Sequence, residues 1–175
     1  MEELIDVLDE NGNKTGEVLT KKQIHERGLC HKIIVVAIID RNGHILMQKR
    51  AKNKDVNADK WDISVAGHVS SGQTSLEAAI RETFEELGIK IHKEEFKYIL
   101  MYKNNEKIKE NYIDNQIYDC YIVNREEIQL QDIKIQESEV EAVKLCNLDE
   151  FRTLIANHNV MYREKLYKEI IRYLK

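Results

Sequence analysis

The segment from Gly67 to Ile89, GHVSSGQTSLEAAIRETFEELGI, limits what this chain of 175 residues can fold into more than any other stretch. It predicts a tight, glycine-containing loop and then a helix. The helix begins at a capping box formed by Thr74 and Glu77 and ends at Gly88. Helical spacing places six residues on one face, which we expect to pack against a core: Leu76, Ala79, Ile80, Thr83, Phe84 and Leu87.

Three glutamates, Glu82, Glu85 and Glu86, fall on the roughly opposite face of this helix. Residues three and four apart on a helix lie about 5–6 Å from each other, so the carboxylates repel unless a cation lies among them. Oxygen ligands suit Mg²⁺ or Mn²⁺, held by a few carboxylates together with waters and substrate phosphates. A glutamate-rich face is usually only a solvated surface. The capping signals and the spacing of Gly67 and Arg81 favour metal-assisted chemistry on a phosphate compound instead.

The segment resembles the Nudix box, G-x5-E-x7-R-E-U-x-E-E-x-G-U, in which U is an aliphatic residue. Seven positions match at the right spacing: Gly67, Arg81, Glu82, Glu85, Glu86, Gly88 and Ile89. The resemblance implies a metal held by the three glutamates, with the Gly67 carbonyl as a further ligand. It also implies that Arg81 orients these carboxylates rather than touching substrate.

Two positions depart from the box. Thr83 stands where the family has an aliphatic residue, and Gln73 stands where it has its first glutamate, which pairs with the box arginine. Gln73 can accept a hydrogen bond from Arg81 but carries no charge. We therefore expect the loop to keep its shape and to bind the metal more weakly. A non-catalytic, nucleotide-binding Nudix domain stays open as an alternative.

The composition narrows the class of protein. Hydrophobic residues make up 42% and charged residues 33% of the chain, as in an ordinary globular protein, and the net charge of -4 argues against a surface that coats nucleic acid. The longest apolar run, residues 33–39, is too short to span a membrane. The N-terminus has no signal-peptide pattern, and Cys30, Cys120 and Cys146 form no paired or metal-binding motif. We expect a cytoplasmic protein with free thiols.

The order of expected elements predicts an α/β protein with a mixed sheet. Strands are expected at 4–9, 33–40, 44–50, 61–66, 96–103, 116–123 and 139–145, helices at 20–27, 148–156 and 160–174 besides the box helix, and polar loops at 51–60 and 104–111. The turn at 41–43 gives the clearest hairpin signal. Strands interleaved with helices indicate a sheet covered on both faces, as in the Nudix-like α/β/α sandwich. We expect one domain over residues 1–175, with the helix at about 160–174 packed on it.

Residues 1 to about 150 also resemble type 1 isopentenyl diphosphate isomerases and their hydrolase relatives. In the isomerases a catalytic cysteine precedes the Gly-His pair, where this chain has Ala66, and a methyl group cannot transfer a proton. The isomerases also carry Glu-Asn-Glu where this chain has Asp114-Asn115-Gln116. Isomerase activity is the disfavoured alternative.

Other polar residues have two interpretations each. His25, His31 and His68 resemble histidines of the isomerase metal site, but for His31 and His68 we favour structural histidines that hydrogen-bond to the backbone. Lys49 and Arg50 end a strand, where they could hold a diphosphate or simply be solvated.

The function predicted from these residues is metal-dependent hydrolysis of a diphosphate bond. The substrate would be a small molecule of nucleoside-diphosphate type or another organic diphosphate. Glu85, Glu139 and Glu141 are candidates for the general base, and the last two would share one face of a strand or form an exposed acidic edge. No nucleic-acid polymer or membrane is expected as a partner, and the chain would be a monomer or a homodimer.

Overall fold

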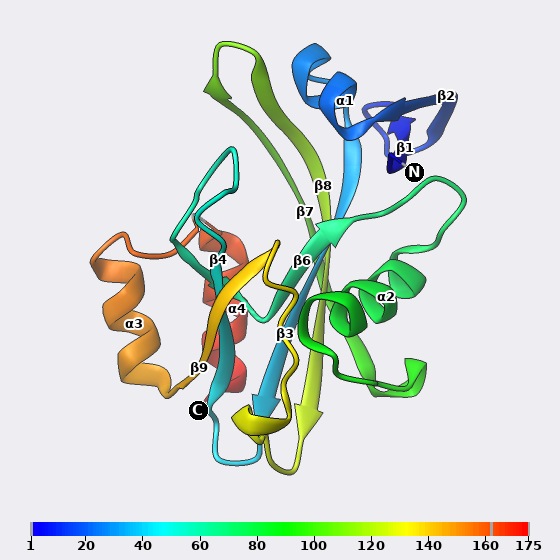
Figure 1. Cartoon of the computed structure of the whole chain (residues 1–175). Coiled ribbons are helices and arrows are strands. Elements are labelled where there is room, and N and C mark those ends of the chain that lie inside the picture. The colour runs from blue at the N-terminus through cyan, green and yellow to red at the C-terminus, as the bar shows by residue number, and fades with distance from the viewer. Residues whose placement is uncertain (1, 162, 175) are drawn as a thin grey trace.

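A mixed β-sheet forms the centre of the computed structural model, which describes residues 2–161 and 163–174 (Figure 1). Its strands are β3 (His31–Asp40), β4 (Ile45–Arg50), β5 (Trp61–Ile63), β6 (Val65–His68), β7 (Phe96–Lys109), β8 (Tyr112–Arg125) and β9 (Val140–Cys146). β3 and β8 pair in parallel, whereas β3 with β6, β4 with β9 and β7 with β8 are antiparallel. The predicted mixed sheet is confirmed.

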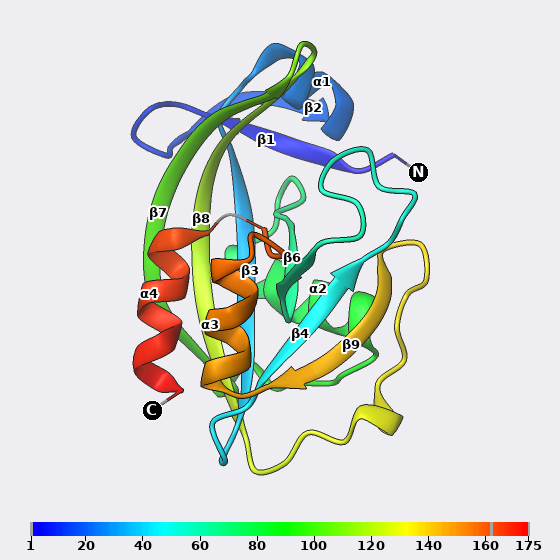
Figure 2. The same cartoon turned by 90° about the vertical axis from the view of Figure 1, so that its left-hand side faces the viewer.

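Strand β3 is buried on both of its faces because helices cover both sides of the sheet. Its odd-numbered residues from Ile33 to Ile39 join one core with α3 (Leu148–Ala156) and α4 (Glu164–Tyr173). Its even-numbered residues join a second core with α2 (Ser75–Leu87). Figure 2 shows α3 and α4 on one side of the sheet and α2 on the other. The three layers are those of the predicted α/β/α sandwich.

The N-terminal residues form a separate small layer. A hairpin of β1 (Leu4–Leu8) and β2 (Lys14–Thr20) is followed by α1 (Lys21–Arg27). Ile5, Val7 and Ile24 form a third apolar cluster between them. This layer lies at the end of the sheet where β6 leads into the loop before α2 (Figure 1).

The polar loop predicted at residues 104–111 is wrong. β7 continues to Lys109, with Asn104 opposite Gln116 and Glu106 opposite Asp114. This part of the hairpin extends past the cores, so its side chains are largely polar and show no apolar alternation. The backbone pairing with β8, which no local pattern reveals, determines its conformation.

The predicted hairpin around residues 41–43 is present only at its turn. β3 and β4 pair at Ile39 and Ile45 and then diverge. Ser64 bridges the gap, because its hydroxyl donates to the Leu46 carbonyl and accepts from the Ile38 amide. The strand predicted at 61–66 is therefore divided at Ser64 into β5 and β6.

The C-terminal helix is shorter than predicted. It begins at Glu164, and residues 159–161 run beside Trp61, where the Met161 amide donates to the Trp61 carbonyl at 2.9 Å. The single domain over 1–175 stays a prediction, and residues 1, 162 and 175 lie outside the described part. None of the described helices is long and apolar enough to cross a membrane.

Candidate active site

Helix α2 has the predicted boundaries. Thr74 and Glu77 form the capping box, with the Thr74 amide donating to Glu77 Oε2 at 2.8 Å, and Gly88 ends the helix at φ +69°. Five of the six residues predicted to face the core do so, and Phe84 is the exception at 49% exposed. The inward face comprises Ala78, Ala79, Thr83, Glu86 and Leu87. The helix thus packs on the sheet through Leu87 and the small side chains of Ala78 and Ala79, and Glu86 also lies on this inward face.

The three box glutamates differ in burial. Glu86 is buried and the Glu82 side chain is only 12% exposed, whereas the Glu85 side chain is 48% exposed. Glu82 lies directly against the loop at Gly67, where an added Cβ atom would stand 2.3 Å from Glu82 Cδ. Any larger residue at position 67 would displace this carboxylate. All four residues line one cavity of about 800 Å³.

Arg81 connects the loop to the carboxylates. Its Nη1 lies 2.9 Å from both Glu82 Oε1 and Glu85 Oε2. On the loop side, Nε donates to Gln73 Oε1 at 3.2 Å and Nη2 donates to the His68 carbonyl at 3.1 Å. The expected hydrogen bond between Arg81 and Gln73 is therefore present.

Burial sets the electrostatics of this cluster. Burial raises the pKa of Glu82 to about 7, against the opposing effect of Arg81. Burial and the neighbouring Glu82 charge hold the pKa of Glu86 well above its ordinary value, although Gln48 Nε2 donates to Glu86 Oε2 at 3.0 Å. Crowded carboxylates of this kind are stabilised by a cation. Because the donors are all oxygens, the set fits Mg²⁺ or Mn²⁺.

The candidate bases lie in different surroundings. Glu139 belongs to the turn before β9 and not to a strand, and it lines the cavity, with its carboxylate 2.5 Å from Lys54 Nζ. Glu141 is exposed on β9, 3.0 Å from Lys52 Nζ. The structure therefore brings Glu139 to the same cavity as the box glutamates.

Lys49 and Arg50, the two residues predicted to hold a diphosphate, also lie in different surroundings. Lys49 is paired with Asp59 at 2.7 Å. Arg50 lines the cavity, where Nη2 donates to the Val56 carbonyl at 3.3 Å. Its Nε is buried and has no hydrogen-bond partner among the described residues. Of the two cations, only Arg50 is therefore among the residues that line the cavity.

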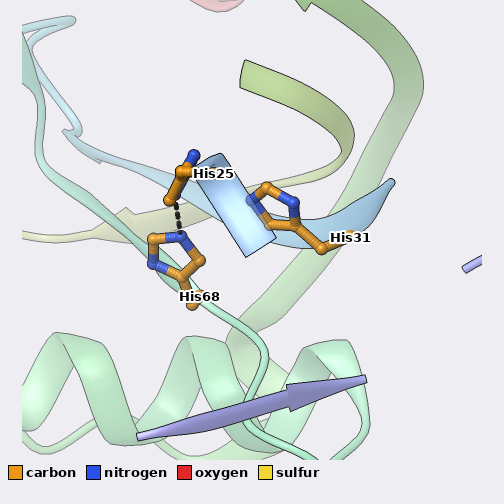
Figure 3. A group of neighbouring side chains, drawn as sticks. All are labelled: His25, His31 and His68. Atoms are coloured by element: carbon orange, nitrogen blue, oxygen red, sulfur yellow. Dashed lines mark hydrogen bonds between the residues drawn. The ribbon is translucent and has the colours of Figure 1, made fainter. Parts of the chain in front are cut away.

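Three histidines from different elements meet beside the cavity, with ring nitrogens within 4.8 Å of one another (Figure 3). His25 Nε2 lies 3.1 Å from His68 Nε2, and His31 Nδ1 lies 3.0 Å from the Leu29 carbonyl. Burial lowers the pKa of His31 to about 4 and that of His68 well below its ordinary value. The expected backbone hydrogen bond is present at His31. Neutral, oriented imidazoles could also hold a transition-metal ion.

Sequence reasoning missed several residues of the cavity. Arg163 makes two hydrogen bonds of 2.8 Å to the buried Asp62 carboxylate, 101 residues away in the chain. It also lies over the Tyr118 ring, with Cζ 5.2 Å from the ring centroid. Lys54 and Glu3 line the cavity as well. No local pattern could have placed them, because each reaches the site through contacts distant in sequence.

Comparisons with known proteins identify the family of this chain. The family model described as the NUDIX domain matches residues 30–167. Nudix hydrolase 3 of Arabidopsis thaliana is 35% identical over 92% of this chain, which spans only 21% of that relative's length. An uncharacterised Nudix hydrolase of Listeria monocytogenes is 33% identical over 85% of this chain and 82% of its own length. Isopentenyl-diphosphate Delta-isomerase 2 of Photorhabdus laumondii is 29% identical over 93% of this chain and 87% of its own length.

Solved structures show the same fold at low sequence identity. The protein DR0079 of Deinococcus radiodurans aligns with a TM-score of 0.70 at 18% identity, over 97% of this chain and 98% of that one. A second match is a bifunctional NMN adenylyltransferase/ADP ribose pyrophosphatase of Francisella tularensis, complexed with AMP and a manganese ion. It aligns with a TM-score of 0.59 at 20% identity, over 82% of this chain and 40% of that one.

The chain therefore belongs to the Nudix family. It is an enzyme of the Nudix hydrolase class, which acts on diphosphate bonds, and its relatives include proteins named as isopentenyl-diphosphate isomerases.

Proposed function

We propose that this Nudix hydrolase cleaves a small organic diphosphate of nucleoside-diphosphate type, with Mg²⁺ or Mn²⁺ as cofactor. The observation that carries the proposal is the burial of Glu82 and Glu86, which both line a cavity of about 800 Å³. Burial penalises the charged forms of both carboxylates, and a divalent cation would remove that penalty. The volume lies within the range of small-molecule sites.

The proposed metal ligands are Glu82, Glu85 and Glu86, with the Gly67 carbonyl as a further ligand. A cation bound there would polarise phosphoryl oxygens and neutralise charge on the departing phosphate. Arg81 holds Glu82 and Glu85 through one guanidinium nitrogen, so it orients the carboxylates before any ligand arrives.

Glu139 is our proposed general base. It lines the cavity with the box glutamates, and its carboxylate lies 2.5 Å from the Lys54 ammonium. Glu85 is already proposed as a metal ligand, and Glu141 is exposed on β9 and is not among the residues that line the cavity. Glu139 would accept a proton from the attacking water, and Arg50, which lines the cavity, would bind the diphosphate through its guanidinium group.

The proposal is tested on the purified full chain with a panel of nucleoside-diphosphate-linked compounds and other organic diphosphates, with and without Mg²⁺. We expect release of phosphate or a nucleoside monophosphate only with metal. Glu85→Gln and Glu86→Gln should each lower turnover by about 100-fold or more, because each removes a metal ligand. Glu139→Gln should lower it far more than Glu141→Gln. Glu137→Gln, in an exposed turn, is the matched control.

The alternatives are distinct outcomes of the same panel. Conversion of isopentenyl diphosphate without phosphate release would indicate an isomerase, which Ala66 and Gln116 at the cavity disfavour. Thermal stabilisation by a nucleotide without any turnover would indicate a binding domain. Metal-independent hydrolysis, or full activity in both glutamate variants, would refute the proposed site.

A further inference from the structure

We propose that Glu3, just before β1, is a positioning residue that gives Arg81 the carboxylate partner that Gln73 cannot supply. Glu3 Oε1 lies 3.7 Å from Arg81 Nη2. Through this contact, a residue some seventy positions upstream would hold the loop of residues 67–74 against helix α2. The inference deepens the metal-dependent hydrolysis proposed above and rests on it.

The partners of Arg81 explain why an added charge matters. Toward the helix, its partners are the carboxylates of Glu82 and Glu85. Toward the loop, Gln73 Oε1, the His68 carbonyl and Ser70 Oγ accept its hydrogen bonds, and all three are neutral. The helix side would therefore hold the guanidinium more strongly than the loop side unless a carboxylate stands there. Glu3 occupies that place.

Ser70 connects the two charged groups. Its hydroxyl donates to Glu3 Oε1 at 2.7 Å and accepts from Arg81 Nη2 at 3.3 Å. The side chains of Glu3 and Arg81 are 33% and 26% exposed, so neither is freely solvated. Hydrogen bonds to ionised groups are stronger than neutral ones, and the serine lets both ions share one oxygen. The chain from Glu3 through Ser70 to Arg81 thus joins β1, the loop and α2.

The backbone of β1 determines where Glu3 stands. The Ser71 amide donates to the Leu4 carbonyl at 2.7 Å, and Ile5 forms a β-bridge with Ser70. Asp6 accepts from Ser71 Oγ at 2.8 Å and from the Gly72 amide at 3.2 Å. β1 therefore lies along the loop as an added edge, and the residue before Leu4 faces Arg81 without a flexible linker between them.

The consequence concerns the metal ligands. The loop follows directly from the last two residues of β6: Gly67, whose backbone lies against Glu82, and His68, whose carbonyl accepts from Arg81. Loosening the loop would move the Gly67 carbonyl relative to Glu82. Groups that orient metal ligands typically change metal affinity or activity by 10–100-fold when removed.

The test is a double-mutant cycle on the full chain with a C-terminal tag. Glu3→Gln, Gln73→Glu and the double variant are compared by Mn²⁺ affinity from electron paramagnetic resonance and by amide hydrogen exchange of residues 67–74. We expect Glu3→Gln to weaken Mn²⁺ binding about 10-fold and to speed loop exchange. When Gln73→Glu is added to Glu3→Gln, the double variant should recover both the Mn²⁺ affinity and the loop exchange rate to within about threefold of the parent. The reason is that Gln73→Glu returns a carboxylate to the same guanidinium.

Two further variants separate positioning from charge alone. Ser70→Ala leaves every charge in place and should also weaken Mn²⁺ binding and speed loop exchange. Glu17→Gln removes a carboxylate that pairs with Arg27 at 2.6 Å in the same N-terminal layer, and it should change neither reading.

Three results would overturn the inference: a Glu3→Gln variant that matches the parent, a double variant as weak as Glu3→Gln, or an equal loss in Glu17→Gln. Neither readout requires turnover. If Glu3→Gln loosens the loop but the parent cleaves no diphosphate, the proposed function fails while the role of Glu3 stands.

Discussion

At the scale of single residues, Glu82 and Glu86 combine a carboxylate group with burial, which disfavours its charged form. Both are carboxylates with little access to water, and both face the cavity. Arg81 offsets part of the cost for Glu82, and Gln48 offers Glu86 one neutral hydrogen bond. Buried charge is tolerated in proteins where it is paired or bound to metal. The cost of burying these two carboxylates is the physical reason to interpret them as metal ligands.

The raised pKa of Glu82, about 7 against an ordinary 4.5, predicts a pH-dependent effect of magnesium. In the metal-free protein, the stability linked to this proton is full below pH 4.5 and is lost as the pH rises through 7. Magnesium must displace that proton below pH 7, so its apparent affinity should fall by about tenfold per unit. We expect Mg²⁺ to raise the unfolding temperature more at pH 8 than at pH 5.5, as measured by calorimetry. An equal rise at both pH values would contradict the assignment.

At the scale of elements, α1 and α2 begin with the same device. Thr20 with Gln23 caps α1, and Thr74 with Glu77 caps α2, each pair closing a full capping box. The two helices differ in what they carry, because only α2 bears the box glutamates. They therefore form a natural matched pair for separating helix stability from site geometry.

We predict that Thr74→Ala and Thr20→Ala each lower the free energy of unfolding by about 1 kcal/mol, since each loses a capping hydrogen bond. Only Thr74→Ala should also weaken Mn²⁺ binding, because its cap begins the helix that carries Glu82 and Glu86. Urea denaturation and manganese titration of both variants provide the check. Equal manganese affinity in the two variants would show that the α2 cap does not hold the site.

At the scale of the whole molecule, the C-terminal segment is tied to the sheet by a buried ion pair. Arg163 and Asp62 are both buried and joined by two hydrogen bonds. The pair holds the residues before α4 beside β5, where Met161 and Arg163 line the cavity. The end of the chain thereby becomes part of the wall of the site.

We predict that Arg163→Met lowers the free energy of unfolding by about 3–5 kcal/mol, because it leaves the Asp62 carboxylate buried without its charged partner. Arg172→Met, which removes an exposed arginine paired with Glu169 at 2.7 Å, should change it by less than about 1 kcal/mol. Urea denaturation measures both. Similar losses in the two variants would show that the buried pair contributes no more than a surface pair.

The box helix, its caps, the mixed sheet and the family could be predicted from sequence because their signals are local. The capping signals of Thr74, Glu77 and Gly88 lie within one helix. The continuous apolar run of β3 indicates a strand that is buried on both faces. The orientation of Phe84, the extended hairpin at 104–109, and the places of Glu139 and Arg50 could not. Each depends on how elements distant in the chain pack together.

The amino-acid sequence by itself determined which carboxylates are available and which helix presents them, since spacing along a helix is set by its geometry. Only the tertiary structure decided which of them are buried, that Glu3 faces Arg81, and that Arg163 closes on Asp62. The physical reason is that burial and charge pairing arise between residues tens of positions apart. Such contacts exist only once the sheet and its two covering layers have come together.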